Sequence, residues 1–137
     1  MNKIKYDSNL IKLITLFESM TGAKVKDCIS NEKLIFVIGE NEMGKAIGKN
    51  GINIRKMEKM LKRRIKLVEF SNNVLQFVRN MVYPIEILDV SMENDIITIY
   101  GKDASTKGML IGRERQHVNH LTDIVKRYFE VREIKVE

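Results

Sequence analysis

The chain of 137 residues is poor in cysteine, proline and tryptophan, with one Cys, one Pro and no Trp. A single cysteine, Cys28, can form neither an internal disulfide nor a thiolate metal site, which excludes a disulfide-rich scaffold and fits a reducing compartment. No run of 18 apolar residues is present, and the N-terminal stretch lacks the apolar region of a signal peptide. We therefore expect a soluble cytoplasmic protein without a membrane partner.

Patterns typical of enzymes and of metal sites are also missing. His117 and His120 lack a third ligand at a spacing that suits zinc, and no paired carboxylates or Ser/His/Asp arrangement is recognisable. The glycine spacing before Gly48 is one residue too short for a Walker loop, and Lys49 is followed by Asn50 instead of Ser or Thr. The dinucleotide fingerprint is absent as well. We expect no catalysis, metal, cofactor or small-molecule substrate.

The positive charge is concentrated in one segment. The chain has 24 basic and 18 acidic residues, a formal charge of +6. Residues 44–66 hold nine basic residues and one acidic residue, a net charge of +8, while the other 15 basic and 17 acidic residues leave the rest of the chain at −2. A block this one-sided repels itself unless an anion neutralises it, so it predicts a phosphate-rich partner.

The order of expected elements repeats after 64 residues. Hydrophobic periodicity predicts a helix from Ser8 to Gly22, strands near Ala23–Ile29 and Lys33–Ile38, a short helix, a glycine loop, a long helix and a strand over Ile65–Phe70. The shift places Gly44, Ile47 and Gly48 on Gly108, Ile111 and Gly112, and it places Ile35 on Ile99. The first strand aligns poorly. We expect an α+β protein of two domains, 1–70 and 71–137.

The loop Gly48-Lys49-Asn50-Gly51 lies between the short and the long helix of the first domain. Its glycines allow positive φ and a close approach of the backbone to a ligand, and the following helix N-terminus favours phosphate. A sugar-phosphate backbone can lie across this loop while bases enter a groove beside it, and basic side chains of the helix extend the positive surface. The candidate binding residues are Ile47, Gly48, Lys49, Asn50, Gly51, Ile52, Ile54, Arg55, Lys56, Lys59 and Arg63.

The segment from Ala46 to Ile54 resembles the signature of the KH domain, which implies a reader of single-stranded nucleic acid whose loop clamps about four nucleotides. The helix and two strands before the signature resemble the type II order. This resemblance implies two tandem type II KH-like domains, each a three-stranded mixed sheet covered by helices.

Tandem KH units of this length resemble the archaeal type of the NusA family of transcription factors. That resemblance implies single-stranded RNA binding in transcription elongation or termination, with RNA polymerase as a second partner. Two other readings stay open: a factor for ribosomal RNA processing or ribosome association, and a protein-interaction module that docks on RNA polymerase.

The second domain departs from the KH pattern because its loop reads Gly112-Arg113-Glu114-Arg115. Arg115 replaces the second glycine, and Glu114 places negative charge where phosphate would approach. The segment 107–128 has five basic and two acidic residues, so its excess is only +3. We expect weaker RNA contacts here, made by the side chains of Arg113 and Arg115 beside Gly112.

Overall fold

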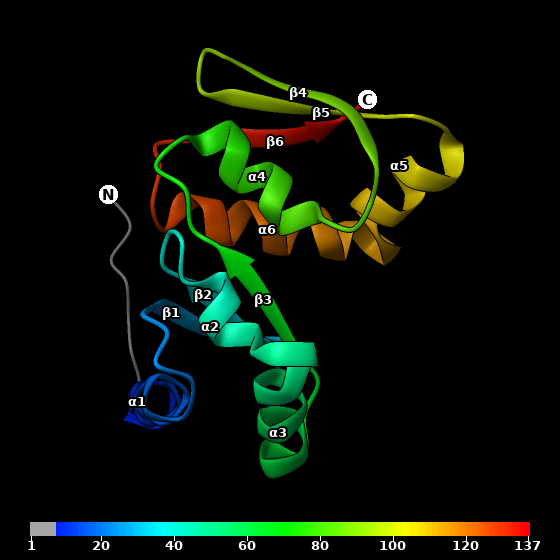
Figure 1. Ribbon diagram of the computed structural model, residues 1–137. Coiled ribbons are helices and arrows are strands. Elements are labelled where there is room, and N and C mark those ends of the chain that lie inside the picture. The colour runs from blue at the N-terminus through cyan, green and yellow to red at the C-terminus, as the bar shows by residue number, and fades with distance from the viewer. Residues whose placement is uncertain (1–7) are drawn as a thin grey trace. The chain divides into compact units, whose positions relative to one another are not determined.

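The computed structural model describes residues 8–137, and its chain divides into two units between Ser71 and Asn72 (Figure 1). Each unit has the order helix, strand, strand, short helix, 3₁₀ turn, long helix, strand. This order confirms the α+β class and the repeat. The first seven residues, with which the first predicted domain begins, lie outside the described range.

The first unit places a three-stranded mixed sheet beside three helices. Its central strand runs antiparallel to the preceding strand and parallel to the last one. The parallel pairing requires a crossover, and the short helix, the glycine loop and the long helix supply it. The elements are α1 (Ser8–Thr21), β1 (Val25–Ser30), β2 (Leu34–Ile38), α2 (Met43–Ile47), a 3₁₀ turn η1 (Lys49–Gly51), α3 (Ile52–Leu61) and β3 (Ile65–Glu69).

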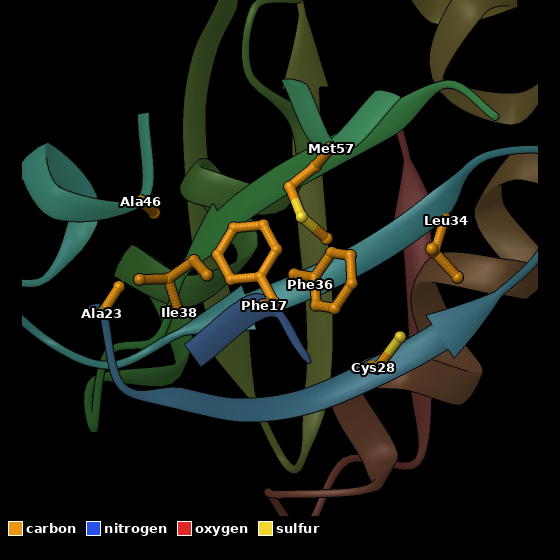
Figure 2. Packing of buried hydrophobic residues seen from close by; sticks show 8 residues of the cluster. All are labelled: Phe17, Ala23, Cys28, Leu34, Phe36, Ile38, Ala46 and Met57. Carbon is orange, nitrogen blue, oxygen red and sulfur yellow. The ribbon is translucent and has the colours of Figure 1, made fainter. Parts of the chain in front are cut away.

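The core of the first unit fixes the orientation of α3. Phe17 of α1 stacks on Phe36 of β2 with ring centroids 4.4 Å apart. Figure 2 shows Met57 reaching from α3 onto these two rings, and all three side chains are fully buried. Because Met57 holds one side of α3 against the sheet, the opposite side of the helix faces solvent.

The second unit repeats this topology, with β5 between antiparallel β4 and parallel β6. Helices α4 and α6 lie side by side on one face of its sheet (Figure 1). Phe77 of α4 is buried and makes an edge-on contact with Tyr128 at 5.6 Å. The elements are α4 (Val74–Val82), β4 (Ile87–Glu93), β5 (Ile96–Gly101), α5 (Ala104–Ile111), a 3₁₀ turn η2 (Arg113–Arg115), α6 (Gln116–Lys126) and β6 (Glu133–Val136).

The shift of 64 residues does not hold in the sheets. Each first strand contains a bulge, at Asp27 and at Asp89, and these two positions are 62 residues apart. The hairpin that follows spans residues 31–33 in the first unit and only Asn94 and Asp95 in the second. Both residues of the shorter turn have positive φ, as two-residue hairpins prefer. This difference in turn length explains the poor alignment of the first strands.

The prediction that Ile99 corresponds to Ile35 is therefore wrong by one residue. Counted from the bulges, Ile99 lies opposite Val90 as Phe36 lies opposite Cys28. Phe36 and Ile99 are both fully buried. The inward-facing position is thus kept, although the residue number shifts.

Candidate functional site

The backbone of the first glycine loop turns through three residues of positive φ. Gly48 has φ 76° and ψ 168°, a region that is nearly exclusive to glycine. Asn50 (φ 56°) and Gly51 (φ 73°) adopt the left-handed helical region. Asparagine is among the residues that tolerate this region, so Asn50 fits the loop better than most side chains would.

Backbone hydrogen bonds hold the loop as a tight turn between two helices. The N–H of Gly48 donates to the carbonyl of Gly44 at 2.9 Å, and the N–H of Gly51 donates to the carbonyl of Gly48 at 3.0 Å. Lys49 and Asn50 open the 3₁₀ turn, and the first N–H groups of a helical turn have no acceptor inside it. These donors suit an anion that lies across the loop.

Asn53, in the first turn of α3, ties the two helices together. Its Nδ2 donates to the carbonyl of Lys45 in α2 at 2.9 Å. A Cβ atom at Gly48 would lie 2.8 Å from the Cγ of Asn53, closer than real Cβ contacts come. Gly48 is therefore required twice, for its φ and for the room that Asn53 needs.

Arg55 makes a second tie, to the loop itself. Its Nη1 donates to the carbonyl of Asn50 at 2.6 Å. The same nitrogen lies 3.5 Å from where a Cβ at Gly51 would stand. The guanidinium thus lies directly beside the second glycine and adds positive charge to the loop.

The solvent-facing side of α3 carries the basic residues that the sequence singled out. Ile52, Arg55, Lys56 and Lys59 are all exposed and recur at the three- and four-residue spacing of one helix face, opposite buried Met57. This face begins at the loop and runs along the helix. The structure therefore brings these four predicted residues together with the loop.

Apolar side chains flank the loop on both sides. Ile47, at the end of α2, is 39% exposed, and Ile52, at the start of α3, is 44% exposed. Ile54 is half-buried. Large exposed apolar residues beside a basic loop offer surfaces on which bases can pack.

Most of the positive charge at the loop has no acidic neighbour. Lys45 Nζ lies 3.3 Å from Glu42 Oε2, and the pKa of Glu42 is lowered chiefly because its carboxylate accepts a hydrogen bond from the backbone N–H of Lys24. No ion pair within residues 8–137 involves Lys49 or Lys56. The charge of these lysines is thus available to a ligand.

Arg63, also predicted to bind RNA, does not continue the basic face of α3. The helix ends at Leu61, and Lys62 adopts a left-handed conformation with φ 53° that redirects the chain. Arg63 then turns to the hairpin between β1 and β2, where it donates to Ser30 Oγ and to the carbonyl of Asn31, both at 2.8 Å. Its guanidinium supports the sheet, away from the face that carries Lys59.

A basic hollow lies at the C-terminal end of α3. Its lining residues are Glu58, Lys59, Lys62, Arg63 and Arg64. The carboxylate of Glu58 accepts a hydrogen bond from the N–H of Ile65, so the only acid of the basic segment is engaged in holding the chain after the helix. The positive surface therefore extends beyond the loop to the end of the helix.

The second loop keeps the backbone path of the first in spite of its different sequence. Gly112 has φ 75° and ψ 172°, and Glu114 (φ 54°) and Arg115 (φ 62°) take the left-handed conformations of Asn50 and Gly51. Arg113, Glu114 and Arg115 are exposed. Replacing the second glycine changed the side chain but not the turn.

His117 occupies the place of Asn53 in the second unit. Its Nδ1 lies 2.9 Å from the carbonyl of Met109, which can only accept, so this nitrogen carries the proton and donates. A Cβ at Gly112 would lie 2.7 Å from the Cγ of His117. The sequence gave His117 only as a surface or base-stacking residue, because a single bond from a side chain to a backbone carbonyl leaves no periodic signal.

Comparisons with known proteins agree with this geometry. The sequence profile described as "NusA-like second KH domain" matches residues 13–73, which spans most of the first unit. The chain is 36% identical to the "Probable transcription termination protein NusA" of Methanococcus vannielii, over 98% of this chain and 80% of that protein. The chain belongs to the NusA family.

Other members of the NusA family match along their whole length. The "Probable transcription termination protein NusA" of Thermoplasma acidophilum is 31% identical over 100% of this chain and 98% of that protein. The crystal structure of APE1850 superposes with a TM-score of 0.73 at 26% identity and covers 96% of this chain and 100% of that one. The tandem KH architecture expected from the sequence is confirmed.

Two searches of the described residues found no other kind of site. Within residues 8–137, no group of three or more His, Cys, Asp or Glu side chains could hold a metal ion. No helix in the same range has the length and apolar character to cross a membrane.

Proposed function

We propose that this protein binds single-stranded RNA and acts in transcription elongation or termination, with the first glycine loop as its main clamp. The observation that carries the proposal is the glycine loop itself, which opens a helix with exposed Arg55, Lys56 and Lys59 on its free face. The relatives named as transcription termination proteins supply the biological setting.

The loop geometry suggests how RNA would be held. A phosphate group approaches the N–H groups at Lys49 and Asn50, where Gly48 and Gly51 present no side chain to obstruct it. Lys49 and the basic side chains of α3 neutralise neighbouring phosphates. The bases then pack on the exposed side chain of Ile52 and on the other flanking isoleucines, Ile47 and Ile54. This division of labour gives affinity through the backbone and leaves base choice to the apolar walls.

The second loop would add weaker contacts. Its backbone path allows the same approach at Gly112, but Glu114 repels phosphate and the side chain of Arg115 covers the turn. We propose that Arg113 and Arg115 contact phosphate through their guanidinium groups, which bind phosphate in two-pronged fashion. The second unit then helps to position an RNA that the first unit holds.

The direct test replaces Lys49 and Asn50 together by Asp, which places two negative charges on the loop. RNA binding, measured by fluorescence anisotropy, should be abolished while the circular dichroism spectrum and unfolding midpoint stay normal. A matched control changes Lys12 and Asn41 to Asp, since both are exposed and Asn41, with φ 65°, shares the left-handed backbone of Asn50. Unchanged RNA affinity of the loop variant would refute the proposal.

Two other roles compatible with the fold are separable by experiment. Crosslinking in cells distinguishes nascent transcripts, which the proposal requires, from ribosomal RNA, which a role in ribosomal RNA processing or ribosome association would give. Co-purification with RNA polymerase after nuclease treatment tests the polymerase as a direct partner. A docking module would keep polymerase binding in the Lys49 and Asn50 variant, whereas an RNA-tethered complex would lose it.

A further inference from the structure

The two units hold their loops with different side chains in the same place. Asn53 and His117 are 64 residues apart, and so are Lys45 and Met109, whose carbonyls accept their hydrogen bonds. Both bonds measure 2.9 Å. An amide and an imidazole share little chemistry except a donor N–H at this reach. What the two units have in common is therefore the bond from the second helix to the last turn of the first.

The same side chains also pack on the first glycine of each loop. Beside Gly48 the nearest atoms to a built Cβ belong to Asn53, and beside Gly112 they belong to His117. One residue thus sets both the spacing of the two helices and the space above the first glycine. Because the loop has only the 3₁₀ turn between these helices, fixing both ends fixes the direction of its N–H groups.

We propose that Asn53 is a positioning residue for RNA binding, which holds the Gly48 to Gly51 loop in its binding conformation without touching the RNA. This inference rests on the proposed function. A loop that is already ordered loses less conformational entropy when it binds, so the gain appears as affinity. His117 has the same part in the second unit, and the second loop keeps its path with Arg115 at the left-handed position for that reason.

The proposal separates the hydrogen bond from simple packing. Asn53→Leu keeps nearly the volume of the side chain but has no donor, whereas Asn53→His brings in the donor that the second unit uses. If packing alone matters, Leu and His should behave alike. If the bond to the Lys45 carbonyl matters, only His should replace Asn53.

The experiment measures the affinity of the full chain for a labelled single-stranded RNA of about ten nucleotides, longer than the stretch one KH loop holds. Asn53→Ala and Asn53→Leu should weaken binding about 5- to 10-fold, as expected for one lost hydrogen bond. Asn53→His should stay within about 2-fold of wild type. Asn119→Ala, at an exposed position of α6, is the matched control and should bind as wild type does.

A second readout does not depend on RNA. Amide hydrogen exchange at Gly48, whose N–H donates to Gly44, should accelerate in Asn53→Ala and Asn53→Leu and stay slow in Asn53→His. Wild-type affinity of Asn53→Ala, or a folded Asn53→His that binds as weakly as Asn53→Ala, would overturn the inference. If wild type fails to bind the RNA, the proposed function fails, and with it the part of the inference that concerns affinity. The exchange pattern then decides whether Asn53 orders the loop.

Discussion

At the scale of single residues, the glycines around the first loop have three different reasons to be glycine. Gly48→Ala meets Asn53 at 2.8 Å and forces alanine to φ 76° and ψ 168°, so the free energy of unfolding should fall by about 2 kcal/mol or more. Gly51→Ala meets only ordinary contacts and should cost about 1 kcal/mol for its left-handed φ. Urea unfolding of both variants measures these changes.

Gly44 is the matched control for this pair. It lies inside α2, is exposed, and a Cβ added there would meet nothing within 4 Å. Gly44→Ala should therefore raise the free energy of unfolding by about 0.5–1 kcal/mol, because alanine is the better helix former. Equal losses for Gly48→Ala and Gly51→Ala would contradict the steric role given to Asn53.

Arg115 carries the same backbone cost in the second loop. A non-glycine residue at φ 62° is disfavoured, so Arg115→Gly should stabilise the protein by about 1 kcal/mol. Arg113→Gly is the comparison, since Arg113 has no positive φ and glycine there should only add flexibility to the unfolded chain. Thermal unfolding distinguishes the two, and a destabilised Arg115→Gly would show that its side chain contributes more than its backbone costs.

Sequence reasoning identified the first loop because glycine pairs and basic residues are visible one position at a time. It missed the tie made by Asn53, since one side-chain bond to a carbonyl eight residues away depends on how two helices meet. It also read Arg115 as the loss of a loop that in fact keeps its path. Packing of His117 against Gly112 overrides the local preference of Arg115.

At the scale of elements, the end of α3 decides which basic residues face the same way. Helical periodicity would place Arg63 on the row of Arg55 and Lys59. The left-handed Lys62 ends that periodicity one residue earlier. Sequence reasoning could not place this end because no glycine or proline marks it.

Arg63 should therefore contribute to stability more than to binding. Arg63→Ala removes two hydrogen bonds from a charged donor to the β1–β2 turn and should lower the free energy of unfolding by about 2 kcal/mol. Arg63→Lys should recover only part, since lysine lacks the fork that reaches both acceptors. Arg64→Ala, an exposed neighbour, is the control. If Arg63→Ala lost RNA affinity at unchanged stability, the structural role would be wrong.

The start of α5 makes stability depend on acid pH. The carboxylate of Asp103 accepts a hydrogen bond from the N–H of Thr106 at 2.7 Å, which lowers the pKa of Asp103 below its ordinary 3.8. A lowered pKa in the folded state means that this contribution is complete above 3.8 and is lost as the pH falls through the folded value. Asp103→Asn keeps a capping side chain that does not titrate.

Urea unfolding of wild type and Asp103→Asn at neutral and acid pH measures this dependence. Wild type should lose more stability than the variant between neutral pH and about pH 3. Asp103→Ala should lie below both at neutral pH, because it has no cap. Parallel profiles for wild type and Asp103→Asn would show that the cap does not depend on the charge.

At the scale of the whole molecule, the two units share a fold but not a charge. Both loops follow the same path, so backbone geometry alone does not distinguish them. The segment 44–66 has a net charge of +8, whereas 107–128 has +3. The asymmetry was readable from the sequence because charge needs only counting, while the equal loop geometry needed the structure.

This asymmetry predicts where the salt dependence of RNA binding originates. Each neutralised phosphate contributes about 0.7 to the slope of log K against log salt for single strands. Replacing Lys49, Lys56 and Lys59 by Gln should therefore reduce the slope by about 2. The control replaces Lys12, Arg132 and Lys135, which are exposed outside the basic segment, with the same loss of charge. A similar reduction in the control would mean that RNA responds to net charge alone, and the first loop would lose its place as the main clamp.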